Sequence, residues 1–500
     1  MNSSHPYFLC PAPGGLIFFA EDVKNGRELW FTDGTEQNTY LLADINPGKG
    51  GCGFLWPYED TGYSIQIVSN GNQFQFWKTD GTVGGTKFLM NLNKYGSITL
   101  QGQMIKFKNK YYFQNYDSLH GYELWVADIN WTQVHMFKDI VPNDSILKEV
   151  QIRGLIEVDN SLYFIANDSI YKNRYQYTIF KSDGTDTGTY KLNINQANPY
   201  SYLYSIGSDL YFVAQPDTGF SALCRYNTKN GVFEILYQDG IERIQSDLHI
   251  HGSHIYFRTY DYSNGRSASW VFDTRNSMLQ KFTLSDPAIT SNYIGSIHTF
   301  DTFTLMGIQS DLYGTEYWRL NQDGLGASFI YDFNPGPSGS INTIPIINKN
   351  GKAYFLVQNP NVFRLWESDG TIDNTRVYYE FNQVNDIRFM TFLNGKFILF
   401  GDFNSAYGNE IYAIDLDNSI ETNQEKQIQI YPNPVSPGGA IKITHFELAE
   451  NIKLIDMNGK IILVEAGEGE IKIPLHLNKG VYCLQIQLGE KILTRKIIVE

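Results

Sequence analysis

The sequence predicts an all-β protein: a β-propeller of about eight to nine four-stranded blades, followed by a small Ig-like β-sandwich. Two observations lead to this fold class. One hydrophobic position recurs at steps of 44 to 55 residues, and Asp or Asn follows three positions later in each of nine copies. Short β-rich segments bounded by Gly, Asp and Asn surround each copy, and aromatic residues make up 15% of the chain. Aromatic rings suit pleated, half-buried surfaces.

The recurring positions, here called the tryptophan column, are Trp30, Trp77, Trp125, Phe180, Cys224, Trp270, Trp318, Trp366 and Tyr412. The polar residues that follow them are Asp33, Asp80, Asp128, Asp183, Asn227, Asp273, Asn321, Asp369 and Asp415. A period in the mid-forties indicates a repeat architecture, in which one supersecondary unit stacks on the next. Cys224 replaces a ring in this column and is predicted to be a small buried residue.

Each unit is predicted to be an antiparallel meander of three or four strands. A first strand, as at residues 154–158, precedes a hydrophobic second strand, as at residues 16–20. A turn that usually contains Gly, such as Gly26, leads to the third strand, which carries the column residue. The fourth strand follows the Asp, as at residues 41–45.

Asp-Gly-Thr follows the third strand in four copies, at residues 33–35, 80–82, 183–185 and 369–371. Asp can accept hydrogen bonds from amides two residues on, and Gly supplies a positive φ without steric cost. We therefore expect the repeated Asp to stabilise turns. Calcium binding is the alternative, but calcium takes roughly six to eight oxygens from one compact loop, and each unit offers a single Asp.

A four-stranded unit cannot bury both faces of its own sheet, and stacking the units around an axis solves this problem. The column residues would fill the space between neighbours, each contributing roughly 1.5–3 kcal/mol or more. Residues 1–421 are therefore predicted to form the propeller. The last unit has no good outer strand before Asn423. We expect residues 7–10, or a segment upstream of this sequence, to supply that strand and close the ring.

Composition restricts the partners. A net charge of −14 and a pI near 5.2 argue against nucleic acid or anionic membranes, because phosphate binding needs clustered Lys and Arg. No apolar run reaches the ~18 residues that a membrane span needs. The first fifteen residues lack the charged and apolar regions of a signal peptide.

Four cysteines are scattered along the chain, at Cys10, Cys52, Cys224 and Cys483. The absence of a CxxC pair excludes a zinc ribbon. Cys10 and Cys52 could meet as a disulfide in the first repeat.

The repeat region resembles the ELWxxDGT-repeat proteins, a propeller-like family of secreted bacterial proteins. The residues that carry this resemblance are GRELWFTDGTEQNT at 26–39, FWKTDGTVGGT at 76–86, FKSDGTDTGT at 180–189 and RLWESDGTIDNT at 364–375. The third, fifth, sixth, seventh and ninth copies are degenerate. The resemblance implies an architecture and no catalytic activity.

Composition changes after residue 421, where a polar linker at 422–429 precedes a module at 430–500. Short strands are predicted at 440–444, 452–456, 460–464, 470–474, 480–488 and 491–499. About seventy residues with six or seven strands suggest a small β-sandwich, with a carbohydrate-binding sandwich as the alternative to a targeting role.

This module resembles the type A C-terminal sorting domain of type IX secretion. The residues that match are Tyr431, Pro432, Asn433, Pro434, Asp456, Gly459, Lys460, Gly480, Tyr482 and Lys496. The resemblance implies export through the type IX machinery to the medium or the outer-membrane surface. It also implies an N-terminal signal peptide, so we expect a truncated N-terminus, with a mis-assigned start or a removed signal as the alternatives. It also implies removal of the module by a sortase-like peptidase, with a cut expected near residues 422–427, where extended polar chain suits proteolysis.

Three groups of residues could form a metal, catalytic or sugar-binding site. His249, His251 and His254 resemble a metal site but lack an evident fourth ligand, so we expect ordinary strand histidines. Carboxylates two residues before the column could form the acid pair of a glycosidase, but their spacing follows the repeat, so packing or polar pairing is expected. These carboxylates are Glu28, Glu123, Glu316 and Glu410.

Tyrosines in loop-like stretches could stack on sugars, with loop packing as the alternative. They are Tyr58, Tyr116, Tyr175, Tyr177, Tyr200, Tyr202, Tyr260 and Tyr262. The arginines that a sialidase-like centre would need, at 153, 174, 243, 258 and 388, are too scattered in sequence to assign. No GxSxG, HExxH, Walker A or dinucleotide motif is present, and no catalytic, metal or cofactor residue is predicted.

The sequence therefore favours an exported, non-enzymatic propeller that binds a glycan or a surface protein. A secreted propeller enzyme acting on polysaccharide and a purely structural surface protein are the alternatives.

Overall fold

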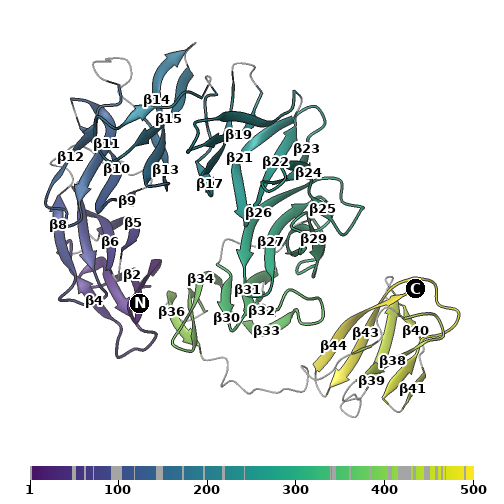
Figure 1. The fold of residues 1–500 in the computed structure, drawn as a ribbon. Helices are drawn as coiled ribbons and strands as arrows, with labels where there is room; N and C mark the ends of the chain where they lie inside the picture. Colours follow the sequence, from purple (N-terminus) through teal and green to yellow (C-terminus); the bar gives the residue numbers. More distant parts are fainter. Residues whose placement is uncertain are drawn as a thin grey trace. The chain divides into compact units, whose positions relative to one another are not determined.

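The computed structural model describes residues 3–47, 52–60, 63–70, 73–91, 104–117, 119–141, 150–171, 174–194, 197–216, 220–240, 242–337, 339, 345–359, 362–381, 384–403, 408–414, 430–431, 435–443, 451–456, 460–462, 465–467, 469–488 and 491–500. The chain divides into two compact units, Met1–Ile414 and Asp415–Glu500. All regular secondary structure in the described ranges is strand (Figure 1).

Nine sheets follow one another in chain order within the described part of the first unit. The first sheet comprises β1 (Tyr7–Ala12), β2 (Gly15–Asp22), β3 (Gly26–Thr32) and β4 (Tyr40–Ala43). The second comprises β5 (Cys52–Asp60), β6 (Tyr63–Asn70), β7 (Gln73–Thr79) and β8 (Lys87–Asn91). The third comprises β9 (Ile105–Phe107), β10 (Lys110–Asp117), β11 (Gly121–Asp128) and β12 (Val134–Lys138). The fourth sheet comprises β13 (Ile152–Val158), β14 (Ser161–Tyr171), β15 (Arg174–Ser182) and β16 (Tyr190–Lys191). The fifth comprises β17 (Tyr204–Ile206), β18 (Asp209–Ala214), β19 (Ala222–Asn227) and β20 (Phe233–Gln238). The sixth comprises β21 (Glu242–His251), β22 (His254–Asp261), β23 (Arg266–Asp273) and β24 (Met278–Lys281).

The last three sheets of this unit vary in size. The seventh comprises β25 (Thr283–Leu284), β26 (Asn292–Thr299), β27 (Thr304–Ser310), β28 (Gly314–Leu320) and β29 (Gly326–Phe329). The eighth comprises β30 (Ile347–Lys349), β31 (Lys352–Asn359), β32 (Val362–Ser368) and β33 (Arg376–Phe381). The ninth comprises β34 (Asp386–Leu393), β35 (Lys396–Asp402) and β36 (Asn409–Ile414). The seventh sheet has five strands because β25, which follows the sixth sheet, pairs parallel to β29. All other pairings in these nine sheets are antiparallel meanders, as the turn signals predict.

The second strand of each sheet carries the continuous hydrophobic runs seen in the sequence. Residues 16–20 of β2 are all buried, and residues 162–166 of β14 are fully buried. A strand buried on both faces needs no alternation of polar and apolar residues. These strands therefore lie between two neighbouring sheets rather than at a surface.

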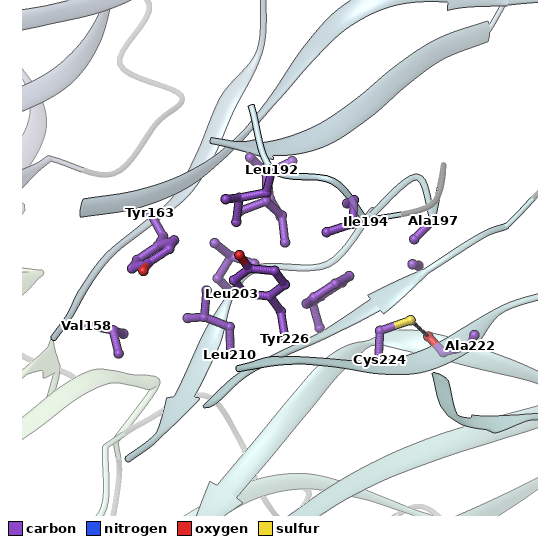
Figure 2. Packing of buried hydrophobic residues seen from close by; sticks show 14 residues of the cluster. Val158, Tyr163, Leu192, Ile194, Ala197, Leu203, Leu210, Ala222, Cys224 and Tyr226 are labelled. Atoms are coloured by element: carbon purple, nitrogen blue, oxygen red, sulfur yellow. Dashed lines mark hydrogen bonds between the residues drawn. The ribbon is translucent and has the colours of Figure 1, made fainter. Parts of the chain in front are cut away.

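Hydrophobic clusters join each sheet to the next. Pairs of residues from the two sides of successive interfaces are Phe31 and Trp77, Phe76 and Phe113, Phe107 and Leu162, Tyr163 and Phe212, Tyr211 and Phe257, Tyr256 and Trp318, Tyr317 and Phe355, and Tyr354 and Phe397. Figure 2 shows the interface between the fourth and fifth sheets, where Tyr163 faces Leu210 and Tyr226 beside Cys224. Because every sheet shares its core with its neighbours, no sheet here has an independent core.

The ninth sheet also contacts the first. Leu16 and Phe18 of β2 share a buried cluster with Ile398 and Phe400 of β35. The Asn394 side-chain amide donates to the carbonyl of Asp33 at 3.0 Å. The contacts between sheets therefore form a complete cycle along the chain.

The expectation that residues 7–10 complete the last sheet is wrong. β1 pairs antiparallel with β2 of the first sheet, from Ala12↔Gly15 back to Tyr7↔Phe19. A tight turn with Gly14 at φ 77° connects the two strands. A local hairpin closes a very short loop, whereas pairing with the ninth sheet would join residues some four hundred positions apart. In the described residues the ninth sheet has three strands, and the cycle of contacts is completed by side-chain packing.

The tryptophan column lies on the third strands of the sheets. Trp318 and Cys224 are fully buried, and Trp125, Phe180 and Trp366 are at most 6% exposed. Trp30, Trp77, Trp270 and Tyr412 are half-buried. Burial raises the pKa of the Cys224 thiol to about 12, so it behaves as an inert hydrophobic residue. The side chains of Cys10 and Cys52 lie outside the described part, so their predicted disulfide stays a prediction.

The second unit consists of two four-stranded sheets. They comprise β37 (Ile430–Tyr431), β38 (Ala440–Ile443), β42 (Glu470–Lys472) and β41 (Glu465–Gly467), and β40 (Ile461–Ile462), β39 (Asn451–Asp456), β43 (Gly480–Leu488) and β44 (Lys491–Val499). Ile441 and Ile471 of one sheet pack with Leu454, Leu484 and Ile497 of the other in one core. Along β38 and β43 every second residue is buried and the residues between them are half-buried or exposed, which explains this two-layer packing.

Candidate functional site

The four Asp-Gly-Thr turns share one hydrogen-bond pattern. Asp33 Oδ1 accepts from the Thr35 amide at 2.9 Å and from the Thr35 hydroxyl at 2.6 Å. Its Oδ2 accepts from the Asn38 side chain at 2.7 Å. The same bonds to Thr recur at Asp80, Asp183 and Asp369. These carboxylates are therefore occupied within their own turns.

The position five residues after the Asp is Asn or Gly, and the turn explains this choice. Asn38 and Asn374 donate to the carboxylate, whereas a Cβ at Gly85 or Gly188 would come within 2.0 to 2.1 Å of the Asp oxygen. The threonine hydrogen bonds lower the pKa of Asp33, Asp80 and Asp183. At Asp369 burial acts to raise the pKa, and bonds from Thr371 and Asn374 outweigh it.

The glycine of each turn approaches the preceding sheet. A Cβ on Gly81 would lie 3.0 Å from Phe31, and one on Gly370 would lie 2.6 Å from Phe303. Gly34 of the first sheet approaches Ile398 of the ninth in the same way, at 3.0 Å. These turns therefore serve packing between sheets. Among the described residues no group of three His, Cys, Asp or Glu side chains could hold a metal ion.

The degenerate copies hold their polar residue by other bonds. Asp128 accepts from the Gln133 amide at 2.6 Å and the Thr132 hydroxyl at 2.8 Å. Asp273 accepts two bonds from the Arg275 guanidinium, at 2.9 and 2.8 Å. Asn227 donates to Asp209 at 2.7 Å, and Asn321 accepts from Ser328 at 2.8 Å. Asp415 lies outside the described residues.

Asp273 gives a pH test. The Arg275 hydrogen bonds lower its pKa from 3.8 to about 2, so this carboxylate stabilises the fold above about pH 4 and the contribution is lost as the pH falls towards 2. The difference in unfolding free energy between the wild type and Asp273→Asn should shrink over that window, as measured by urea titration at pH 6, 4 and 3. Arg275→Ala should show the same change in pH dependence. A difference that stays constant down to pH 2.5 would contradict the assigned pKa.

The repeated glutamates bind main-chain amides. Glu28 is fully buried and accepts from the amides of Ile45 at 2.8 Å and Asn46 at 3.1 Å. Glu123 accepts from Ile140 at 2.8 Å, again seventeen residues later. Glu410 accepts from the Ser4 amide at 2.8 Å, which links the ninth sheet to the N-terminal segment. Glu316 is fully buried on β28. These roles agree with polar pairing and do not require an acid pair.

The histidines occupy the β21–β22 hairpin. His251 pairs in register with His254, and His249 pairs with Tyr256. His254 lies 3.8 Å from Asp273 and is buried, and burial lowers its pKa. Burial also lowers the pKa of His249. Both rings are therefore integrated into the sixth sheet.

Two of the predicted tyrosines line one cavity. Tyr200 and Tyr262 line a cavity of about 330 Å³ together with Gln215, Ser221, Arg243, Ile244 and Gln245. These residues come from the start of β21, from segments flanking the fifth sheet and from the β22–β23 turn. A cavity with tyrosine, amide, hydroxyl and guanidinium groups suits a polar ligand with hydroxyl groups.

The wall of this cavity is held by Ile244. Its side chain is buried in the cluster between the fifth and sixth sheets. Its amide donates to Ser221 Oγ at 2.6 Å, and its carbonyl accepts from the Tyr200 hydroxyl at 2.6 Å. Successive strand residues point to opposite faces, so Arg243 and Gln245 face away from the core and towards the cavity.

A β-bulge follows this point. Ile244 pairs with Thr259, and the next paired residue, Leu248, pairs with Phe257. β21 therefore runs four residues where β22 runs two, so the bulge on β21 holds two extra residues. Bulges redirect side chains and are frequent beside binding sites. The first-strand bulges next to Arg153 on β13 and Ile294 on β26 hold one extra residue each. The larger bulge therefore distinguishes the cavity from the equivalent place in those sheets.

The two tyrosines of the cavity, Tyr200 and Tyr262, differ in their exposure to solvent. Burial raises the pKa of Tyr200 to about 12, against the effects of Ser221 and Arg243, so its hydroxyl stays neutral and keeps its bond to Ile244. Tyr262 is 67% exposed, and the Arg243 guanidinium lies over its ring at 5.5 Å from the centroid. Tyr200 is thus a fixed wall, while Tyr262 offers a ring to a ligand.

The other predicted tyrosines lie elsewhere. Tyr177 packs under Arg153 at 4.2 Å and donates to Gln151 at 2.7 Å, with Tyr175 beside it. Tyr116 packs on Tyr122, and Tyr260 on Tyr262. Tyr202 is 46% exposed, and the Tyr58 side chain lies outside the described part. The sequence pointed to Tyr200 and Tyr262 but missed Gln215, Ser221, Gln245 and the role of Arg243.

Residues that match the sorting signal lie at several places in the second unit. Tyr431 ends β37, and the buried Tyr482 donates to the Asn478 carbonyl at 2.8 Å. The Lys460 amide donates to the Asp456 carboxylate at 2.9 Å, across the turn between β39 and β40. Gly480 begins β43, and Lys496 is exposed on β44. Pro432, Asn433, Pro434 and Gly459 lie outside the described residues.

The sequence model of one protein family, described as "Secretion system C-terminal sorting domain", matches residues 429–500. Residues 429–500 are a C-terminal sorting domain. This domain marks the protein for export through the type IX machinery, to the medium or the cell surface. A search of curated proteins finds no match to this chain. In the described ranges no helix is long and apolar enough to cross a bilayer.

Solved structures resemble parts of the chain at low identity. Prolyl oligopeptidase B from Galerina marginata, bound to a 35mer substrate, is 10% identical with a TM-score of 0.42, over 74% of this chain and 55% of its own. One of two prolyl endopeptidases is 10% identical with a TM-score of 0.40, over 73% and 53%. TolB from Acinetobacter baumannii is 12% identical with a TM-score of 0.29, over 55% and 62%. The matches span less than two thirds of these proteins, and at these TM-scores they carry no inference about activity.

Proposed function

We propose that residues 1–421 form a β-propeller of nine blades built from ELWxxDGT-like repeats. The cycle of contacts between the nine sheets supports this proposal. The glycine of the first Asp-Gly-Thr turn meets Ile398 of the ninth sheet much as Gly81 meets Phe31 of the first. The Lys108 amine donates to the carbonyl of Asp183 at 2.9 Å, and Asn394 makes the corresponding bond to Asp33 at 3.0 Å. The contacts between the ninth sheet and the first are thus of the same kind as those between sheets that are neighbours in the sequence.

We further propose that the exported protein is a binding module for a glycan, presented at the cell surface or in the medium. The observation that carries this proposal is the cavity that Tyr262, Arg243 and Gln245 line beside the hydrogen-bonded backbone of Ile244. An exposed aromatic ring can stack on the apolar face of a sugar, while amide and guanidinium groups bind its oxygens. The carboxylates weighed as a glycosidase pair are bound to main-chain amides at Glu28, Glu123 and Glu410. The sorting domain would be removed at 422–427 by a sortase-like peptidase.

A glycan array with the full chain, run beside a reducing-end assay on the same glycans, tests this proposal. We expect retained binding without hydrolysis, and a loss of about two- to tenfold in affinity for Tyr262→Ala, since a stacked ring is worth about 0.5–1.5 kcal/mol. Tyr190→Ala is the matched control, because Tyr190 is 52% exposed on β16 and does not line the cavity. Hydrolysis without retained binding would support the secreted enzyme, and neither binding nor hydrolysis would support a structural role.

A further inference from the structure

Resting on the proposed glycan binding, we infer that this cavity recognises a carboxylated sugar residue, with Arg243 binding the carboxylate. Arg243 is the charged member of the residues that line the cavity; the others are tyrosine, glutamine, serine and isoleucine. A planar guanidinium binds a carboxylate by two parallel hydrogen bonds. A neutral sugar can accept hydrogen bonds from this arginine but leaves its charge without a counterpart, whereas an acidic sugar matches it in charge and shape.

The position of the guanidinium suits this role. It lies over the Tyr262 ring at 5.5 Å, and a guanidinium stacked on a ring keeps its in-plane N–H donors for a ligand. Gln245 stands two residues later on the same side of β21, where its amide can bind a sugar hydroxyl. Ile244 is fixed by bonds from its amide and to its carbonyl, at 2.6 Å each. The strand therefore presents Arg243 and Gln245 from a held backbone.

Neighbouring carboxylates do not compete for this arginine. Glu242 lies on the opposite side of β21 and accepts a hydrogen bond from the Thr259 hydroxyl. Asp239 accepts from the Tyr237 hydroxyl at 3.4 Å. Asp261 accepts from Ser263 and Asn264 in its own turn, at 2.6 Å each. The net charge of −14 spreads over the whole chain, and at physiological salt charges beyond about 8 Å are screened.

An acidic sugar fits these observations better than an acidic peptide. A cavity of about 330 Å³ is at the small end of ligand sites and suits a single ring. The exposed Tyr262 ring offers a flat surface, and hydroxyl and amide groups surround it. A peptide carboxylate would use Arg243, and peptide amides could bind the glutamines, but an acidic side chain offers no ring face to stack on Tyr262.

Isothermal titration of the full chain tests the inference with four probes. They are a uronic acid trisaccharide, its carboxyl-reduced neutral form, a sialic acid trisaccharide and an oligoglutamate peptide. We expect at least one carboxylated sugar to bind at least about tenfold more tightly than the neutral form, with affinity falling as salt rises. The two acidic sugars distinguish a uronate from a sialate.

Variants identify the residue responsible. Arg243→Gln should abolish the preference for the carboxylated sugar, so that the acidic and the neutral forms bind about equally, and Arg243→Lys should restore part of the preference. Arg258→Gln is the matched control, because Arg258 lies on β22 of the same sheet as Arg243, packs over Tyr293 of β26 at 4.3 Å and does not line the cavity. Equal affinity for neutral and acidic sugars would overturn the inference and leave the proposed function intact. Tighter binding of the peptide would also overturn it, and binding of no sugar would overturn both.

Discussion

Replacing Trp318 by alanine should lower the free energy of unfolding by about 3–5 kcal/mol. Trp318 is fully buried at the centre of β28, and its ring lies 4.9 Å from Phe329 and 6.1 Å from Tyr313. Met306 and Ile308 of β27 belong to the same cluster. Alanine would remove the contacts of a whole indole and leave a cavity between the sixth and seventh sheets. A rigid sheet on each side limits collapse into that space.

Urea titration followed by circular dichroism and by fluorescence measures this loss, provided that the two transitions coincide. Trp270→Ala is the matched control, since Trp270 occupies the same column one repeat earlier but is only half-buried. It packs against Tyr237 at 5.4 Å and donates to Thr259 at 3.0 Å. We expect a smaller loss for this variant. A cost below about 1 kcal/mol for Trp318→Ala would contradict the packing described for the column.

The repeat made much of the strand order predictable, because local signals and core packing agree in each unit. Hydrophobic runs such as residues 16–20 mark second strands, and Asp-Gly-Thr marks the turn that follows the third. In the second unit the segments predicted at 480–488 and 491–499 coincide with β43 and β44. The strand predicted at 470–474 is shorter in the structure, as β42 (Glu470–Lys472). Within the described residues of the strand predicted at 460–464, the structure has β40 (Ile461–Ile462).

Features that depend on distant residues could not be predicted in this way. The parallel addition of β25 to the seventh sheet carries no local signal, and the local β1–β2 hairpin was mistaken for a closing strand. The candidate cavity joins Tyr200, Arg243 and Tyr262, which are separated by 43 and 19 residues in sequence. Its geometry follows from the bulge after Ile244, and a bulge adds residues without changing composition. The tyrosines were visible in the sequence, but their meeting with one of the scattered arginines was not.

Phe18→Ala should lower the free energy of unfolding of the first unit by about 3–5 kcal/mol, and Phe400→Ala should do the same. Both rings are 2% exposed, and they meet edge to face across the first and ninth sheets with centroids 5.9 Å apart. If this contact exists in solution, the cost of the double variant differs from the sum of the single costs. The expected coupling is about 0.5–1.5 kcal/mol, the range for aromatic pairs.

An interior interface supplies the control for this cycle. Tyr317 and Phe355 meet edge to face across the seventh and eighth sheets at 4.8 Å, and a cycle on that pair gives the coupling expected where the two sheets adjoin in sequence. A comparable coupling for Phe18 and Phe400 would mean that the ends of the unit are held together as firmly as its interior. Zero coupling there, beside a clear coupling for Tyr317 and Phe355, would show an open array, and the proposed propeller would fail. Because every sheet relies on both neighbours for its core, opening the cycle would expose two hydrophobic faces at once, and we therefore expect this sequence to favour the proposed closed arrangement.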